Sequence, residues 1–483
     1  MLEKIRELER VARRLDPSAD QRHHLLREAG SYAEDFFRRL DAQPAYVPDP
    51  GLDGFSRFPL AEEPAQLGAL LEFYAREVDT TGILPASGGQ LGYIPGGGLF
   101  PSALGDFLVG ISNRYSSVAF AGPGAARMEG ALLRWMADLV GYPDGAAGDL
   151  TSGGSIATLS ALVTARDARE ITPDRVARSC VYLTAQAHHC IGKALHVAGL
   201  GAAQRRFVPM DERFRMDVAQ LESLIADDQR RGLNPWLAIA SAGTTDTGAV
   251  DPIMEIADVA RRFGLWFHAD AAYGGFFLLC EEGREAIQGL QRADSIVMDP
   301  HKGLGVPYGT GAVLVRDGML LARSNAYYAD YMQDAKGLEP APDTPYSPAD
   351  YSLELTRPFR GPRLWFPLKL FGLAAFRAAL AEKIWLARYF HQRLQEMDGF
   401  EPGPFPDLSV VTFRYRPRQG DADEFNRRLL DAVHRDGRVF ITSTRLHGAF
   451  TLRLAVLNFR THLQHIQYLL DILSRTAADM DGG

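Results

Sequence analysis

The N-terminal part of the chain alternates polar and apolar residues at helical spacing. Apolar positions recur every three or four residues from Leu2 to Val11 and again from Leu25 to Leu40, which places them on one face of a helix. Five prolines between residues 44 and 64 interrupt this pattern, and residues 62–78 predict a third helix. We therefore expect a helical N-terminal arm over residues 1–87, whose apolar faces a partner subunit would cover.

From residue 88 onward, short apolar runs alternate with amphipathic helices. This alternation is typical of an α/β fold with a mostly parallel sheet, in which ligands bind at the carboxyl ends of the strands. We expect a large domain over residues 88–374. Its predicted strands cover residues 180–185, 237–243, 265–271, 295–300 and 311–317, and two of its helices cover 157–170 and 253–264.

The pattern changes again after residue 375. A long helix is followed by strands at 408–417, 437–442 and 449–456 and by helices at 424–436 and 462–476. Neighbouring strands with short connections favour antiparallel pairing. We therefore expect a small C-terminal α/β domain over residues 375–483.

Composition narrows the classes of partner. A formal net charge of −8 argues against a nucleic-acid or anionic membrane surface as partner. We find no run near the roughly 20 apolar residues of a membrane span, and the charged, amphipathic start does not resemble a signal peptide. Three cysteines make no disulfide framework, and no spacing suggests a metal site. These features predict a cytoplasmic protein with small-molecule partners.

Two charged residues stand at or near the carboxyl ends of predicted strands. Lys302 is one of only six lysines and precedes a glycine-rich turn; a lysine in a dry site can attack an aldehyde cofactor, although one that simply covers a loop fits the position equally well. Asp270, in LWFHADAAYGG, could pair with the ring nitrogen of pyridoxal 5′-phosphate (PLP) while the ring lies over Ala272. A carboxylate that only caps the strand end is the alternative reading.

Two further segments also carry candidate residues. In LTSGGSIATLSAL, Gly154 and Ser155 begin a helix, where backbone amides and the helix dipole favour a phosphate group. Such turns are also common as simple helix caps. In AQAHHCIGKAL, His188 could stack on the face of a cofactor, although a single histidine is more often structural.

Taken together, these segments resemble a known family. The phosphate turn, the histidine pair, HADAAYGG and DPHK follow one another between residues 151 and 302, and ELTRPFRGPRLW comes later in the chain. The set resembles the group II PLP-dependent decarboxylases, which include aromatic-L-amino-acid, glutamate and histidine decarboxylases. The resemblance implies the α/β fold of type I PLP-dependent transferases, similar to aspartate aminotransferase. It also implies a homodimer with its active sites at the subunit interface.

The resemblance assigns a role to each matching residue. Lys302 would bind the cofactor covalently, His301 would help to hold its phosphate, and Asp270 would pair with the ring nitrogen. Thr245 would lie near the cofactor, and Tyr331 would deliver a proton to the substrate Cα. The implied cofactor site comprises Gly154, Ser155, His188, Thr245, Asp270, Ala272, His301 and Lys302, and the implied catalytic set comprises Lys302, His188, Tyr331 and Asp270.

The chain also departs from the animal aromatic decarboxylases. Asp299 stands where those enzymes carry an asparagine near the phosphate, and a carboxylate there would repel the phosphate unless it turned away. Tyr115 lies near a position that is apolar in those enzymes, and Arg114 beside it could favour an acidic substrate. We take Tyr93, Pro95 and Tyr115 as candidate residues of the substrate pocket.

The resemblance implies decarboxylation of an L-amino acid to its amine and CO2, with an aromatic substrate slightly favoured. A PLP-dependent carbon–carbon lyase or a decarboxylation-coupled aldehyde synthase of the same fold is the alternative. A nicotinamide-binding enzyme is disfavoured because TSGGSIA lacks the GxGxxG spacing. A binding protein that has kept the fold without its chemistry is disfavoured by the intact set Lys302, Asp270, His301 and His188.

Overall fold

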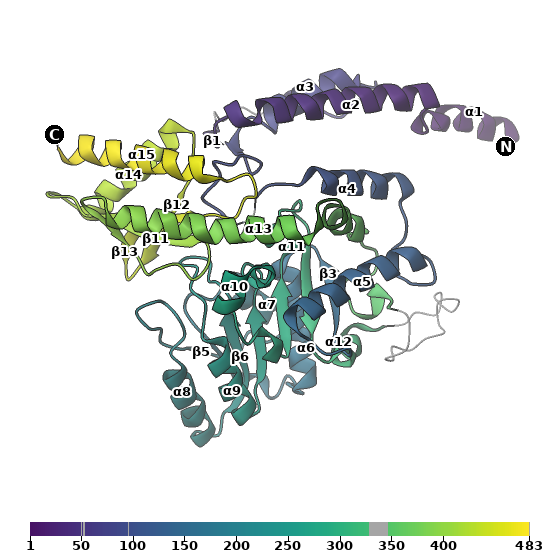
Figure 1. Ribbon diagram of the computed structural model, residues 1–483. Helices are drawn as coiled ribbons and strands as arrows, with labels where there is room; N and C mark the ends of the chain where they lie inside the picture. The colour runs from purple at the N-terminus through teal and green to yellow at the C-terminus, as the bar shows by residue number, and fades with distance from the viewer. Residues whose placement is uncertain (50, 52–53, 95, 328–345, 483) are drawn as a thin grey trace.

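The computed structural model describes residues 1–482 apart from 50, 52–53, 95 and 328–345 (Figure 1). Within these residues, the large domain is built on a seven-stranded sheet of order β3-β9-β8-β7-β6-β4-β5. Only β9 runs antiparallel to its neighbours β3 and β8, so the carboxyl ends of the other strands meet at one edge. The strands are β3 (Ala147–Thr151), β4 (Ser179–Leu183), β5 (Gln204–Phe207), β6 (Asn234–Ser241), β7 (Trp266–Asp270), β8 (Ser295–Met298) and β9 (Gly311–Val315).

The structure confirms the five predicted strands of this sheet and adds two at its edges. Strand β3 reads AGDLT and β5 reads QRRF, and neither contains the apolar run by which the others were found. Strand β3 is nevertheless buried from Gly148 to Thr151, and its buried charge at Asp149 breaks the apolar pattern. The burial of β5 alternates between half-buried and exposed residues, as expected at such an edge.

Helices cover both faces of the large sheet. Successive strand residues pack into two separate cores: Tyr182 and Phe267 belong to one, and Val181 and Trp266 to the other, which is the alternation that strand geometry imposes. The helices of this domain are α4 (Phe100–Ser112), α5 (Pro123–Val140), α6 (Gly154–Ala168), α7 (His189–Val197), α8 (Val218–Arg230), α9 (Ile253–Phe263), α10 (Glu281–Ala286), α11 (Pro300–Gly303) and α12 (Gly318–Asn325).

The N-terminal arm consists of α1 (Leu2–Ala12), α2 (Ala19–Arg39) and α3 (Leu67–Glu77), and it lies apart from the large domain in Figure 1. The predicted start of the third helix at residue 62 is wrong, because the helix begins at Leu67, beyond the proline at position 64. Strands β1 (Tyr46–Val47) and β2 (Gly82–Ile83) pair at the base of the arm. None of the described residues of α1, α2 or α3 is buried.

The C-terminal part of the chain forms an antiparallel sheet of order β10-β11-β13-β12. Its elements are β10 (Phe400–Pro402), β11 (Val410–Tyr415), β12 (Thr442–Leu446), β13 (Ala449–Ala455), α14 (Ala422–Asp436) and α15 (Leu463–Asp481). The predicted strand at 437–442 is wrong: β12 begins only at Thr442, and Phe440 instead forms an isolated bridge with Gln90. The apolar run still contributes to the C-terminal core, in which Val439 and Ile441 are buried.

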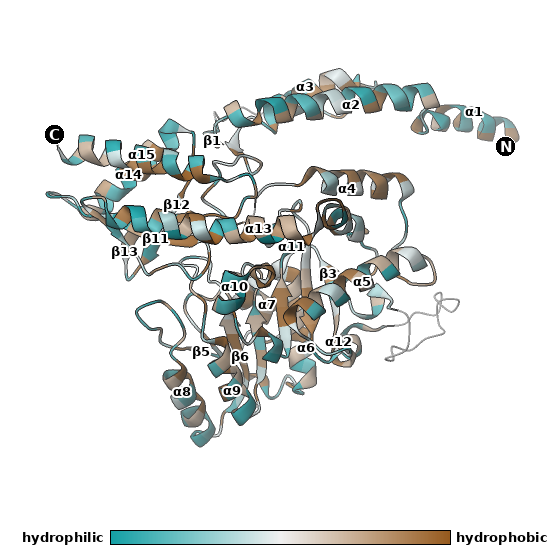
Figure 2. Cartoon of the chain, viewed as in Figure 1, coloured by the Kyte–Doolittle hydropathy of each residue, from teal (hydrophilic) through white to brown (hydrophobic). Residues whose placement is uncertain are grey.

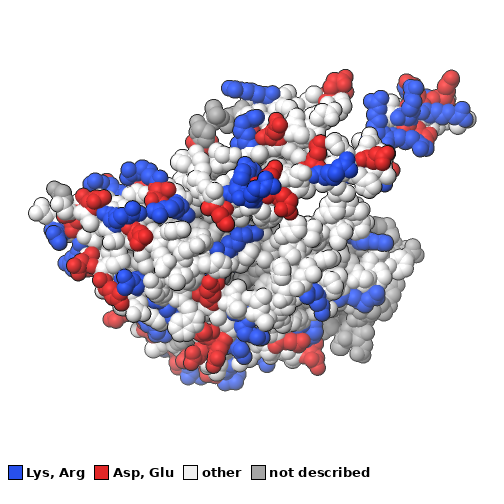
Figure 3. Space-filling view, turned by 45° about the horizontal axis from the view of Figure 1, so that its top comes forward, with Lys and Arg blue, Asp and Glu red and all other residues white. Residues whose placement is uncertain are grey.

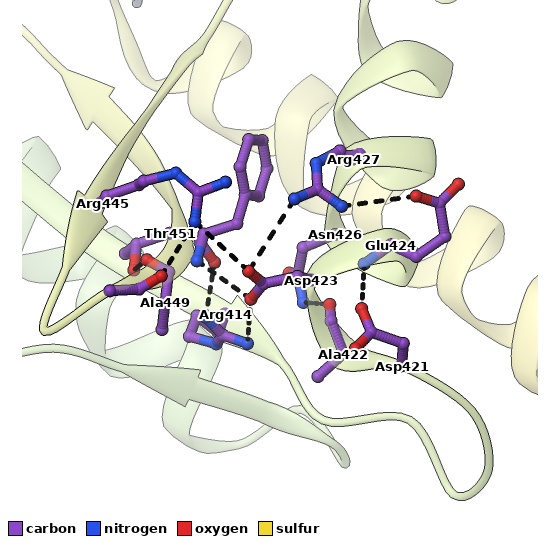
Figure 4. A network of polar contacts seen from close by, with 12 residues as sticks. Arg414, Asp421, Ala422, Asp423, Glu424, Asn426, Arg427, Arg445, Ala449 and Thr451 are labelled. Atoms are coloured by element: carbon purple, nitrogen blue, oxygen red, sulfur yellow. Dashed lines mark hydrogen bonds and ion pairs between the residues drawn. The ribbon is translucent and has the colours of Figure 1, made fainter.

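A polar network fixes α14 on this sheet (Figure 4). The Asp423 carboxylate accepts hydrogen bonds from the Phe450 N–H at 2.9 Å and from Arg414 Nη2 at 3.0 Å. These donors, above all the Phe450 N–H, hold the pKa of Asp423 below its usual value. The first turn of α14 is therefore tied to β11 and β13 by a carboxylate that stays ionised.

Helix α13 (Gly361–Gln395) connects the large domain to the C-terminal sheet. Among the described residues it is long and apolar enough to cross a membrane by length and composition alone, which the apolar runs in the sequence did not lead us to expect. In this fold the helix packs against α4, α5, α15 and β10. Its geometry is interrupted at Gly372, whose φ of 70° and ψ of 161° are not helical.

On the face of the molecule shown in Figure 3, acidic and basic side chains are interspersed.

Candidate active site

A cavity of about 310 Å³ lies at the carboxyl edge of the large sheet. Residues from the ends of β3, β6, β7 and β8 and from the start of α7 meet there. It is lined by Ser152, Gly153, Gly154, Ser155, Ile156, Thr158, His188, Cys190, Gly243, Thr245, Asp270, Ala272, Tyr273, Asp299, His301 and Lys302. All eight residues predicted to bind the cofactor are among them.

The turn after β3 forms one wall of the cavity. Gly153 caps α6 with a φ of 152°, a conformation that side chains rarely adopt. Its carbonyl accepts the N–H groups of Ile156 and Ala157, both at 3.1 Å. The helix begins at Gly154, and the free N–H groups and dipole of a helix start attract an anion. The cavity therefore has an anion-binding wall where the sequence predicts the phosphate.

Asp270 ends β7 in the middle of the sheet, where it pairs with Ser241 of β6 and Val297 of β8. Its Oδ1 accepts a hydrogen bond from the Ala272 N–H at 3.2 Å. Ala272, two residues after Asp270, also lines the cavity. A carboxylate and a methyl group thus stand side by side at the centre of the strand ends, as the pattern HADAAYGG predicts.

Lys302 lies on the short helix α11, which follows β8. Its Nζ is 3.1 Å from Oδ2 of Asp299, the residue before the helix. Burial alone would lower the pKa of Lys302, but the carboxylates of Asp299 and Asp270 outweigh it and raise the pKa above its usual value. In this state the amine is a stable ammonium ion, and it becomes a nucleophile only when the pairing with Asp299 is relieved.

Two histidines face the cavity, and in each of them the hydrogen bond at Nδ1 defines which ring nitrogen carries the proton. His188 caps α7, and its Nδ1 accepts the N–H of Cys190 at 3.3 Å, so the proton of the neutral ring is on Nε2. In His301, Nδ1 contacts the Thr310 carbonyl oxygen at 2.7 Å and must be the donor. Burial lowers the pKa of both rings. Both are therefore neutral near pH 7, His188 with a donor and His301 with an acceptor at Nε2.

Sequence reasoning missed part of the cavity wall and its support. Thr158 and Cys190 line the cavity beside each other, with Oγ1 and Sγ 3.7 Å apart. Burial and then Asp270 raise the pKa of Cys190 to about 11, so its thiol stays protonated. Arg453 of β13 donates from Nε to the Thr245 carbonyl oxygen at 2.8 Å. In the sequence, Arg453 is distinguished only as a charged residue inside the apolar run of this strand.

The structure describes two of the three candidate pocket residues, and it does not place either of them in this cavity. Tyr93 is 54% exposed and Tyr115 is 37% exposed, and neither lines the cavity wall. Pro95 and Tyr331 lie outside the described residues. Arg114 is also exposed, whereas Asp299 lies in the cavity wall and does not turn away from it.

Residues 89–416 match the family described as the pyridoxal-dependent decarboxylase conserved domain. The chain belongs to the pyridoxal-dependent decarboxylase family. It is 33% identical over 384 residues to an aromatic-L-amino-acid decarboxylase of Bacillus atrophaeus, with 79% of each chain covered. It is 29% identical over 495 residues to tryptophan decarboxylase 1 of Oryza sativa subsp. japonica, with 96% of this chain and 95% of the relative covered.

The fold of this pyridoxal-dependent decarboxylase agrees with solved structures. The crystal structure of Oryza sativa TDC with PLP and tryptamine superposes with a TM-score of 0.89 at 27% identity, covering 96% of this chain and 99% of that one. The predicted family, the type I fold and PLP as cofactor are thereby confirmed. The cavity itself suits PLP, since it joins an anion-binding helix start, a lysine amine and a carboxylate for the ring nitrogen in one enclosed space.

Proposed function

We propose that this decarboxylase removes the α-carboxyl group of an aromatic L-amino acid as CO2 and releases the corresponding amine. The observation that carries the proposal is the convergence of Lys302, Asp270 and His188 on the cavity beside the start of α6. The named functions of its relatives, an aromatic-L-amino-acid decarboxylase and a tryptophan decarboxylase, support the aromatic class.

Each side chain has a part in holding the cofactor and substrate. The start of α6 at Gly154 and Ser155, with His301, would hold the phosphate, and Lys302 would hold the aldehyde carbon. Ala272 and His188 would pack on the ring. Bound PLP supplies a sink for the electron pair that the departing CO2 leaves behind.

In the remaining steps, side chains of the enzyme hold or donate protons and stabilise charge. Asp270 would keep a proton on the ring nitrogen of the bound cofactor and would stabilise negative charge delivered to the ring. His188 offers its Nε2–H to the substrate carboxylate while Nδ1 stays engaged with the Cys190 N–H. Tyr331 remains our proposed donor of the proton to Cα, from a segment outside the described residues.

The test is a panel of L-amino acids assayed for CO2, amine, aldehyde and ammonia. We expect CO2 and amine in equal amounts, with aromatic substrates the fastest. Aldehyde together with ammonia would instead support the synthase alternative. Turnover confined to acidic amino acids would refute the aromatic proposal and turn attention to Arg114.

The covalent role of Lys302 is tested by borohydride reduction followed by peptide mass analysis. We expect PLP fixed on Lys302 in the wild type and neither fixation nor turnover in Lys302→Ala. The matched control is Lys193→Ala, at an exposed lysine of α7 outside the cavity, which should behave as the wild type. Fixation on another lysine would refute the assignment.

We further propose that the enzyme is a homodimer with its active sites at the interface. Helix α4 is mostly apolar (Figure 2), and its Phe107 and Ile111 are 46% and 69% exposed. Tyr115, which follows this helix, would then complete a site together with the partner subunit. We expect Ile111→Asp to shift the mass in solution from dimer to monomer and to lose activity. A fully active monomer would refute the proposal.

Domain limits and location complete the proposal. We propose domain boundaries at 87/88 and 374/375, supported by the break of α13 at Gly372, and limited proteolysis would test them.

We also propose a cytoplasmic location, supported by three free thiols at Cys180, Cys190 and Cys280, as expected in a reducing compartment. Fractionation of the source cells would test it.

A further inference from the structure

Asp299 places a buried carboxylate at the phosphate end of the cavity. Its side chain is 1% exposed in the structure. One oxygen, Oδ2, is 3.1 Å from the Lys302 ammonium, and among the described residues the other, Oδ1, has no hydrogen-bond partner. A buried carboxylate oxygen without a donor is costly, so this residue calls for an explanation.

The backbone around Asp299 leaves the carboxylate little room to move. A Cβ placed on Gly154 would lie 2.7 Å from Oδ2, and one on Gly311 would lie 2.7 Å from Oδ1. The Asp299 N–H donates to the Ala272 carbonyl oxygen at 3.2 Å, and its own carbonyl accepts the Lys302 N–H at 2.9 Å. The carboxylate is therefore held against the first residue of α6, where the phosphate is proposed to bind.

The charges facing Asp299 do not suffice for a second anion. Among the described residues that line the cavity, Lys302 is the one cation, and Asp270 at the end of β7 is a further anion. His301 presents Nε2 at 3.8 Å from Oδ2, and this nitrogen is an acceptor because Nδ1–H is engaged with Thr310. His188, which caps α7, instead accepts the Cys190 N–H at Nδ1, and burial lowers its pKa so that the ring is neutral.

We propose that Asp299 takes up one proton from solvent when the cofactor phosphate binds and then donates its O–H to that phosphate. The inference rests on the proposed PLP site. The carboxylate becomes a neutral carboxylic acid, the phosphate keeps its charge, and Lys302 is released from its ion pair with Asp299. Two adjacent anions share a site only when one of them is neutralised. Cofactor loading and release of the Lys302 amine are thereby coupled.

Calorimetry on the apoenzyme with pyridoxine 5′-phosphate tests the proposal. This probe carries the phosphate but has no aldehyde, so it does not react with Lys302. Titrations near pH 8 in buffers of different ionisation enthalpy give the number of protons taken up. We expect about one proton for the wild type and, by linkage, an affinity that falls about tenfold per pH unit. Pyridoxine, which lacks the phosphate, should bind without proton uptake.

Asp299→Asn is the matched variant, because the amide keeps the shape and a donor but cannot titrate. We expect its proton uptake to fall by about one and its affinity to become nearly independent of pH. Equal uptake in variant and wild type would overturn the proposal and indicate His301 as the proton acceptor. Should the variant fold poorly, equal uptake with pyridoxine and pyridoxine 5′-phosphate in the wild type overturns it too. Absence of binding by either PLP or the probe would refute the proposed PLP site itself.

Discussion

Arg357 joins two buried carboxylates, and replacing it by methionine should destabilise the fold in a pH-dependent way. Arg357 donates to Asp149 of β3 and, at 2.7 Å, to Glu129 of α5, and all three side chains are at most 2% exposed. Glu129 also accepts the N–H groups of Arg360 at 2.9 Å and Gly361 at 3.1 Å. The cluster thus ties the segment before α13 to the strand that leads into the phosphate turn.

The structure determines how much stability Arg357→Met should lose and how this loss should depend on pH. Burial, only partly offset by Arg357, raises the pKa of Glu129 to about 7, and burial also raises the pKa of Asp149. A carboxyl whose pKa is raised by folding stabilises the fold at low pH and loses this contribution as pH rises through the folded pKa. Removing the arginine raises both pKa values further. We expect Arg357→Met to cost about 3–5 kcal/mol above pH 8.

The assay is denaturant unfolding followed by fluorescence, at pH 8.5 and pH 6.5. Each extra proton that the variant holds reduces its deficit by about 1.4 kcal/mol per pH unit, so the deficit should shrink by about 2–3 kcal/mol at the lower pH. The control, Arg230→Met, removes an ion pair in which Arg230 is 71% exposed and should cost less than about 1 kcal/mol at both pH values. A deficit that does not change with pH would refute this reasoning.

Three further predictions concern single side chains. His188→Asn keeps an acceptor for the Cys190 N–H but loses the donor into the cavity, whereas His188→Gln keeps a donor and loses the cap. Because both variants lose the ring proposed to pack on the cofactor, we expect kcat to fall in both, at least tenfold further for Asn, and the melting temperature to fall only for Gln. In the presence of dissolved oxygen, which is reduced to hydrogen peroxide, Tyr331→Phe should shift products from amine toward aldehyde and ammonia, measured by chromatography. His268 is buried and its pKa is lowered to about 4, so the fold should lose about 3 kcal/mol between pH 6.5 and pH 4; unfolding curves of His268→Asn should lack this loss.

The site residues that could be predicted from the sequence are those near the carboxyl ends of strands. Lys302, Asp270 and His188 each follow an apolar run that becomes a strand, and parallel strands bring their carboxyl ends together. The ionic support could not be found in this way. Glu129 and Arg357 are separated by 228 positions, and a charge inside an apolar pattern does not reveal whether its partner is solvent or a buried carboxylate. The exposed Tyr115 shows a third limit, since a match between its position and the pocket of a related family does not establish that its side chain reaches this cavity.

The two buried charge clusters act on the same short segment of the chain. Asp149 holds β3 from one side through Arg357, and Asp299 contacts the first residue of α6, five positions later in sequence, from the other. Between them lies the turn of Ser152 and Gly153, whose geometry depends on a glycine that no other residue replaces without strain. Burial raises the pKa of Asp149, so the protonation of this carboxyl changes the balance of charge on the β3 side of the turn. Asp149 therefore links the stability of the fold to the turn at which we propose that the cofactor phosphate binds.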